Sequence, residues 1–219
     1  MKKLLIIAAV LLFFLLPGAS CFGEPAESYY PLKEGMTWVY SISSNKPGAQ
    51  KITVTNLAPR ELQGKSVTPR KWEVVGGVKY YFIAKDDSGV YRYAEQKGET
   101  GEPQIITPKV YYLKNPVDVG TTWDTTTKMG EDDLKVNITV ESIGEKVQVP
   151  AGTYKNCVKL KHEGKVSKEG GGAALSLTAY EWYAAEVGLV KSMFTAKQSI
   201  KGKAEAADSI THQLESFKP

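Results

Sequence analysis

Apolar and polar residues alternate along most of this 219-residue chain. In residues 37–43, for example, Trp38, Tyr40 and Ile42 are separated by polar or smaller residues, a period of two typical of a half-buried strand. The same pattern, bounded by Gly, Pro, Asn and Asp turns, predicts further strands at 50–56, 71–75, 78–84, 90–94, 104–113, 121–127, 134–142, 154–162, 175–184 and 189–196. Strands at this spacing predict an all-β protein, a curved antiparallel sheet or an open barrel or sandwich.

The segments between these strands carry less pattern. Residues 58–65 contain Pro59 and Gly64 and are expected to form a loop. In the tail, Ile210, Leu214 and Phe217 fit a helical stripe, whereas alternation through His212 fits a strand. We favour the strand, because no earlier window of the chain shows a helical stripe.

One motif occurs twice. Residues 31–38 and 116–123 share Pro-x-x-x-Gly-x-Thr-Trp, 85 positions apart. Three further segments of the first half have similar counterparts, in the same order, in the second half: 51–54 is similar to 137–140, 82–84 to 182–184, and 89–90 to 188–189. The alternative is that β-proteins in general reuse Gly, Thr and aromatic residues. The shared motif favours two related halves, pseudo-repeats at about 29–97 and 111–197.

The motif also suggests a local structure. Pro fixes its own φ, Gly permits a turn closed to other residues, and Thr-Trp opens an extended run. A Trp just inside a strand is more often a core anchor than a ligand platform. We therefore expect Trp38 and Trp123 at equivalent places, each at the start of a strand and packed inward.

Residues 1–23 have the pattern of an export signal. Lys2 and Lys3 precede an unbroken apolar run from Leu4 to Leu16, and Pro17-Gly18 ends it before small residues. Thirteen helical residues are too few to span a hydrocarbon core of about 30 Å comfortably, which favours a signal peptide over a permanent anchor. We expect an exported protein of the periplasm or outer membrane, with a tether at 24–28 and a single β domain at 29–219.

The two cysteines leave the processing open. Gly18-Ala19-Ser20-Cys21 is similar to a bacterial lipobox, with Gly where Leu is usual. Either Cys21 becomes the lipidated first residue, which would be the only membrane attachment, or ordinary signal peptidase cuts after Ser20 or Gly23. Cys157 then remains alone, unless an unmodified, retained Cys21 pairs with it. A lone Cys in a strand is usually a packed side chain.

Charge gives no case for nucleic acid. The chain has 28 basic and 24 acidic residues, and loss of Lys2 and Lys3 with the signal leaves 26 and 24, net +2. The basic residues are scattered along the chain rather than clustered.

Three stretches carry distinctive motifs: residues 30–40 read Tyr-Pro-Leu-x-x-Gly-x-x-Trp-x-Tyr, 149–157 include Pro-Ala-Gly-Thr-Tyr, and 181–191 end in Val-Gly-Leu-Val-Lys. Together they resemble a group of uncharacterised bacterial secreted proteins and lipoproteins. Ala185-Glu186 replaces the Pro-Gly usual in the last motif, so the local turn differs. The resemblance spans 29 to about 217 and implies a β fold and an envelope location, with no activity or site.

Motifs for catalysis and metal binding are missing from the sequence. His162 and His212 are the only histidines, and His162-Glu163 lacks the second His of a zinc-protease helix. Residues 86–89 lack the alternating oxygen ligands of a calcium loop. No nucleophile elbow, phosphate loop or dinucleotide fingerprint occurs, so we expect no enzyme, no metal and no cofactor. Paired carboxylates that meet only in the fold stay open.

Tyrosine pairs are the remaining functional hint, at 29–30, 80–81 and 111–112. Neighbours on a strand face opposite ways, so each pair sends one ring inward and one outward. Ordinary sheet packing is one interpretation, and a ligand groove with Tyr80, Tyr111 and Trp182 on its walls is the other. The leading hypothesis is a non-catalytic envelope protein that binds a lipid, another apolar ligand or a protein partner on a bent sheet. The alternative is a structural or assembly lipoprotein.

Overall fold

The computed structural model describes residues 24–45, 50–129, 132–167, 173–200 and 203–219. The predicted signal segment, with Cys21, lies outside the described residues. The described elements are α1 (Ala26–Tyr29), β1 (Thr37–Ser44), β2 (Gln50–Asn56), β3 (Arg60–Leu62), β4 (Lys65–Val74), β5 (Gly77–Asp86), β6 (Gly89–Lys97), β7 (Gln104–Lys114), β8 (Thr122–Met129), β9 (Asp132–Val149), β10 (Gly152–Ser167), β11 (Ala173–Ala184), β12 (Gly188–Ile200) and β13 (Lys203–Lys218).

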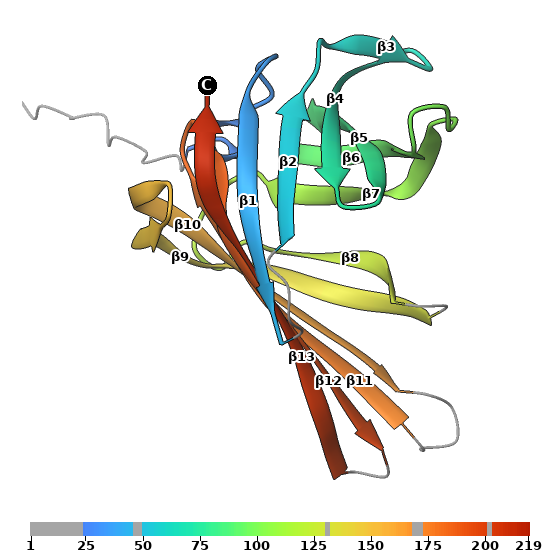
Figure 1. Ribbon diagram of the computed structural model, residues 1–219, viewed down its shortest axis with the longest axis vertical. Helices are drawn as coiled ribbons and strands as arrows, with labels where there is room; N and C mark the ends of the chain where they lie inside the picture. The colour runs from blue at the N-terminus through green and yellow to red at the C-terminus, as the bar shows by residue number, and fades with distance from the viewer. Residues whose placement is uncertain (1–23, 46–49, 130–131, 168–172, 201–202) are drawn as a thin grey trace, which may run out of the picture.

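All thirteen strands belong to one strongly curved antiparallel sheet (Figure 1). Its order is β7-β6-β5-β4-β2-β1-β13-β12-β11-β10-β9-β8, with β3 paired to β4 off this path. The edge strands β7 and β8 approach each other, and the Trp123 indole N–H donates to the Tyr111 carbonyl at 3.3 Å. The predicted all-β class is confirmed, in the form of a nearly closed, barrel-like sheet.

The order of the sheet divides into two meanders. β1, β2, β4, β5, β6 and β7 run in sequence, and so do β8 to β13, with β1 joined to β13. Each repeated motif delivers the first strand of its meander. Gly35 and Gly120 both have positive φ, 81° and 91°, and both donate their N–H to a carbonyl of the second strand of their meander, Asn56 of β2 and Val140 of β9. The arrangement agrees with a duplication, which stays a prediction.

Trp38 and Trp123 are each the second residue of the first strand of a meander, and they are 2% and 5% exposed. Each indole N–H donates to a backbone carbonyl of the opposite meander, Trp38 to Val187 at 2.6 Å and Trp123 to Tyr111. The prediction that both are buried at the start of a strand is confirmed. They also fasten one meander to the other, which the sequence did not suggest.

Three segments differ from the expectation or resolve it. Residues 24–28 do not form only a polar tether, because α1 begins at Ala26 and this side chain is fully buried. Residues 58–65 are not simply a loop, since they contain β3 and the start of β4. The tail forms strand β13, and its Leu214 lies directly opposite Tyr40 of β1.

The longest hairpin is bent. β9 and β10 pair with register shifts near Cys157, where Gly144 and Asn156 have positive φ. The bend carries the hairpin turn back onto β13, where the Ala151 N–H donates to the Leu214 carbonyl at 2.9 Å. Val147 and Val149 are thereby buried in one core cluster with Trp38 and Leu214.

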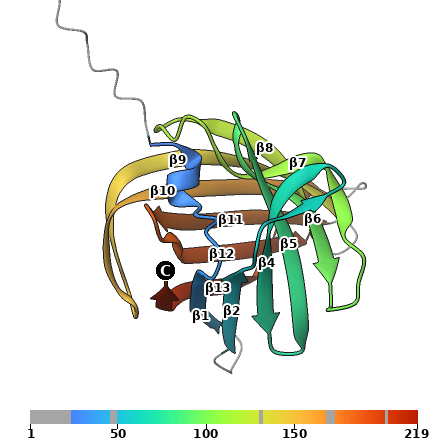
Figure 2. The same ribbon diagram turned by 90° about the horizontal axis from the view of Figure 1, so that it is seen from above.

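The N-terminal segment lies within the ring of strands when the sheet is seen from above (Figure 2). Its backbone is fixed at both ends, because Asn115 accepts the N–H of Ala26 at 2.8 Å and Ser28 accepts the N–H of Glu186 at 2.7 Å. Tyr30 stacks on Tyr112 with 4.8 Å between ring centroids. α1 is therefore part of the core. Among the described residues, no helix is long and apolar enough to cross a membrane.

Candidate functional site

A cavity of about 300 Å³ opens on the concave face between the two meanders, and we call it the inner cavity. It is lined by residues of β6 and β7 from the first meander and of β8 to β12 from the second: Arg92, Val110, Tyr111, Tyr112, Thr125, Thr126, Val136, Ile138, His162, Leu177, Ala179, Glu181 and Phe194. Because the lining comes from seven strands, the cavity exists only in the assembled sheet.

The apolar wall of the cavity follows from strand alternation. Val136 and Ile138 occupy alternate positions of β9, and Leu177 lies on β11, so one face of each strand supplies them. These three side chains are 3%, 4% and 7% exposed. Phe194 of β12 is partly buried against the same cluster. The wall offers a contiguous hydrocarbon surface to whatever enters.

Polar side chains form the opposite part of the lining. The carboxylate of Glu181 accepts a hydrogen bond from the Tyr183 hydroxyl at 2.8 Å and interacts electrostatically with His162 of β10 and His212 of β13. His162 Nε2 is 3.2 Å from Glu181 Oε2, close enough for an ion pair. Burial would raise the pKa of Glu181, but the two imidazoles and the Tyr183 hydroxyl hold it below its usual range. Glu181 is therefore ionised at neutral pH.

The register of the sheet explains a nearby Ser–His contact. Glu181, Ser192 and His212 are direct cross-strand neighbours on β11, β12 and β13. Ser192 Oγ lies 3.0 Å from His212 Nδ1, and burial lowers the pKa of that imidazole. Directly opposed residues of an antiparallel pair are close enough for such a contact, so the strand register alone accounts for it.

The cationic side of the cavity is Arg92 of β6. Its Nε donates to the Tyr112 hydroxyl at 2.9 Å, and its Nη1 lies 3.3 Å from a carboxylate oxygen of Glu95. The guanidinium carbon lies 4.4 Å from the ring centroid of Tyr81 and 5.5 Å from that of Tyr112. Cation–π contacts of this kind orient a guanidinium while leaving its edge able to bind.

Thr125 Oγ1, a buried atom of the lining, has no hydrogen-bond partner within the described part of the chain. The buried His162 Nε2 has the Glu181 carboxylate, at 3.2 Å, as its partner. Unpaired buried polar atoms cost roughly 1–3 kcal/mol each and are uncommon in native folds. Thr125 and His162 both lie in the lining of the inner cavity.

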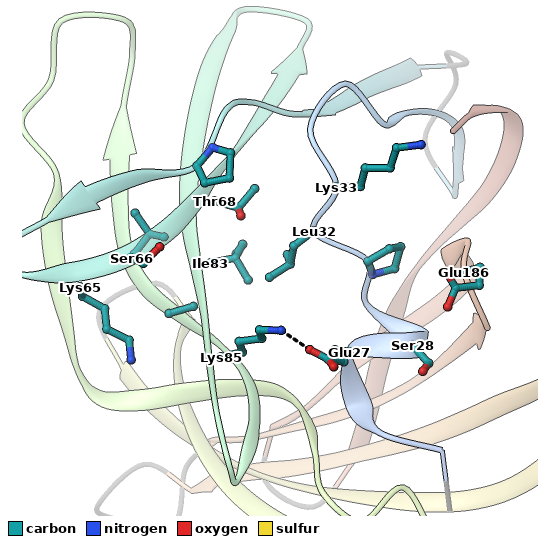
Figure 3. A pocket seen from close by; sticks show the side chains of 14 residues that line it. Glu27, Ser28, Leu32, Lys33, Lys65, Ser66, Thr68, Ile83, Lys85 and Glu186 are labelled. Carbon is teal, nitrogen blue, oxygen red and sulfur yellow. Dashed lines mark hydrogen bonds and ion pairs between the residues drawn. The ribbon is translucent and has the colours of Figure 1, made fainter.

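A larger hollow of about 700 Å³ lies beside α1, between the N-terminal segment and strands β4 and β5 (Figure 3). Leu32 and Ile83 face each other across it, and an ion pair joins Lys85 to Glu27. The two charged side chains of this pair are 62% and 51% exposed. Neither Thr125 nor His162 lies in its lining, so it has less of the character of a ligand site.

The three residues predicted for a groove do not come together. Tyr111 lines the inner cavity, although its hydroxyl donates to Asp86 at 3.0 Å. Tyr80 lines a separate depression and donates to Glu99. Trp182 is buried, and its indole N–H donates to Glu145 at 2.7 Å. The candidate lipidation site Cys21 lies outside the described residues.

The residues of the inner cavity that sequence reasoning missed are mainly Arg92, His162 and Glu181. His162 and Glu181 were visible only as isolated polar residues on strands. In two of the three tyrosine pairs the second member, Tyr81 or Tyr112, contacts Arg92, and in the third pair Tyr30 contacts Arg70. The sequence signal for such a site is a polar residue on the apolar face of an alternating strand. It can be used only when the face that points inward is already known.

No cluster of three or more His, Cys, Asp or Glu side chains suited to a metal occurs among the described residues. Cys157 is fully buried, and this burial raises the pKa of its thiol to about 11. A neutral, enclosed thiol is a poor nucleophile.

Residues 113–203 match the DUF3108-like family, a stretch that covers most of the second meander. No curated protein matches the chain significantly. Two solved structures are similar over most of the chain. One is a protein assigned as exported, with a YmcC-like fold, from Bacteroides fragilis NCTC 9343. Its sequence is 17% identical to this chain, the match covers 87% of this chain and 99% of that chain, and the TM-score is 0.43. The other is a protein assigned as a lipoprotein from Parabacteroides distasonis ATCC 8503, with 18% identity, 87% and 98% covered, and a TM-score of 0.43.

Proposed function

We propose that this protein is a non-catalytic envelope protein that holds a small, largely apolar ligand in the inner cavity. The observation that carries the proposal is the composition of the lining. An apolar wall of Val136, Ile138 and Leu177 meets a few buried polar groups. They are the Thr125 hydroxyl, which has no partner among the described residues, and the His162 imidazole, which lies 3.2 Å from the Glu181 carboxylate. Ligand sites typically combine an apolar surface with a few convergent polar groups.

The size of the cavity limits the ligand. A volume of about 300 Å³ is at the small end of the range for ligand pockets. The polar groups lie on β8 and β10, and the apolar wall spans β9, β11 and β12, so one elongated molecule could touch both. The ligand is therefore a single small amphipathic molecule.

Export supports the envelope location. Lys2 and Lys3, the apolar run and the small residues before Cys21 form a signal segment of the usual organisation. The similarity of residues 30–40 to secreted proteins and lipoproteins agrees with it. The alternative, an assembly role through a protein partner, requires no occupied cavity.

A substitution that fills the inner cavity tests the proposal. Ala179 lines it and lies directly between His162 and Phe194 in the strand register. Ala179→Phe therefore places a large ring in the cavity. Thr178→Phe adds the same ring to the neighbouring position, which faces the other side of the sheet, and is the matched control.

Binding is measured by titrating N-phenyl-1-naphthylamine, a neutral apolar fluorophore, and following the rise in its emission. We expect saturable binding to the wild type and to Thr178→Phe and at least tenfold weaker binding to Ala179→Phe. Equal binding by all three proteins would contradict the inner cavity as the site. No probe binding, combined with a stoichiometric protein partner in native mass spectrometry, would favour the assembly role.

A further inference from the structure

Arg92 sets the charge that the inner cavity presents to a ligand. Of the described residues that line the cavity, it alone carries a guanidinium or ammonium group. Its side chain is 25% exposed, so the group is reachable from the cavity. A charged group at the edge of an apolar cavity selects ligands by the sign of their own charge.

The guanidinium is oriented but not neutralised. The Tyr112 hydroxyl, which accepts from Nε, is uncharged, and the rings of Tyr81 and Tyr112 fix the plane of the group. Glu95 is the only acidic partner recorded for Arg92 among the described residues, at 3.3 Å and with a side chain 41% exposed. Exposed ion pairs at such distances contribute little. Nη2 has no recorded hydrogen-bond partner in the described part of the chain.

The other charged group of the lining is already satisfied. Glu181 has a hydrogen bond from Tyr183 and the imidazole of His162 within 3.2 Å. A cationic ligand would therefore have to compete with His162 for Glu181 and would be repelled by Arg92. An anionic ligand meets a guanidinium whose Nη2 donors are free among the described residues and whose Nη1 is held there only by the partly exposed Glu95, so a carboxylate or phosphate oxygen has a charged donor to accept from.

We propose that the ligand is a single-chain amphiphile with an anionic head, a carboxylate or a phosphate monoester, held by Arg92. This inference rests on the proposed function and specifies its ligand. The hydrocarbon chain lies against Ile138, Leu177 and Phe194, and the hydroxyl of Thr125 lies in the same lining. The cavity volume suits one chain rather than the paired chains of a bilayer lipid.

The experiment compares head groups on one chain length. Dodecanoate, dodecyl phosphate and uncharged dodecanol are titrated by calorimetry below their aggregation concentrations at pH 7.5. Wild type, Arg92→Gln and Arg92→Lys are compared, and Arg60→Gln, which removes an exposed arginine of β3, controls for net charge. Thermal melting checks that each variant is folded.

We expect Arg92→Gln to weaken binding of the anions by about ten- to a hundredfold, as for loss of a hydrogen bond between charged groups. The affinity for dodecanol should change less than twofold in Arg92→Gln, and Arg60→Gln should bind all three compounds like the wild type. Arg92→Lys should bind the anions with intermediate affinity, because it keeps the positive charge but loses the planar set of guanidinium donors. If Arg92→Gln does not fold, the ratio of anion to dodecanol affinity in wild type and Arg92→Lys decides.

The outcomes separate the two proposals. Equal affinity of wild type for dodecanoate, dodecyl phosphate and dodecanol, unchanged in the Arg92 variants, would overturn the anionic head and leave the proposed function standing. Binding of none of the three would overturn both. A preference for only one of the two anions would support the inference and identify the head group.

Discussion

Replacing three tryptophans by phenylalanine tests the account of the core. Trp38, Trp123 and Trp72 lie on different strands, and each substitution keeps a ring while removing the indole N–H. In Trp38 that N–H donates to Val187 at 2.6 Å, in Trp123 it donates to Tyr111 at 3.3 Å, and in Trp72 it is buried with no partner among the described residues. The loss of ring area is common to all three, so the differences between them report the hydrogen bond.

The hydrogen bonds of the three indoles predict how much each substitution lowers the free energy of unfolding. Trp38→Phe breaks a short bond and leaves the Val187 carbonyl unpaired, which should cost about 1–3 kcal/mol beyond the lost ring area. The Trp123 bond is just beyond the usual 2.7–3.2 Å range, so its loss should cost about 0.5–1 kcal/mol. Trp72→Phe removes an unpaired buried donor, which offsets the lost area, and it should be neutral or stabilising.

The assay is urea unfolding followed by far-UV circular dichroism, with the free energy of unfolding obtained by linear extrapolation. The expected order of destabilisation is Trp38→Phe, then Trp123→Phe, then Trp72→Phe. Truncation of Trp38 or Trp123 to Ala should cost roughly 3–5 kcal/mol, as for other buried Trp. If Trp72→Phe destabilised the protein as much as Trp38→Phe, the reasoning from indole partners would be refuted.

Three further predictions concern ionisation and anchoring. The Cys157 thiol has a pKa near 9 in the unfolded chain and about 11 in the folded protein. The stability that it contributes is therefore complete below pH 9 and is lost as the pH rises toward 11. The loss of stability at alkaline pH should be less steep in Cys157→Ala, and a thiol reagent should not label the folded wild type at about pH 8. The pKa of Glu181 in the folded protein lies below its usual value, so the stabilisation by this carboxylate is present above about pH 4.5 and is lost as the pH falls further. In Glu181→Gln the free energy of unfolding should therefore fall less steeply at acid pH than in the wild type. An unchanged pH dependence would contradict the lowered pKa. If Cys21 is acylated, Cys21→Ala should move the protein from membranes to the soluble envelope fraction, whereas unchanged fractionation with a mature N-terminus other than Cys21 would exclude lipidation.

The sequence predicted the parts of the fold that depend on local pattern. Alternation through Trp38, Tyr40 and Ile42 predicted β1, and the repeated motif predicted a buried Trp at the start of β1 and β8. The tail was harder, because a strand and a helix share Ile210 and Leu214. Pairing with β1 decides it in favour of a strand.

The candidate site could not be predicted, because it depends on register and curvature. Arg92 and His162 are 70 positions apart and come to one cavity only because the sheet bends until β7 approaches β8. The tyrosine pairs had the correct alternation, but a shift of one residue exchanges the two faces of a strand. Tyr81 and Tyr112, not their neighbours in sequence, contact Arg92. Burial of Ala26 was also hidden, since its segment carries no apolar period.

Amide chemical-shift changes on addition of dodecanoate to the isotopically labelled protein would locate a bound amphiphile directly. If the ligand occupies the inner cavity, the largest changes occur at Val136, Ala179 and Phe194, which line it from three different strands. The changes at Val136 and Phe194 should disappear in Ala179→Phe. Shifts centred on Leu32 and Ser66, in the hollow beside α1, or no saturable shifts at all, would contradict binding in the inner cavity.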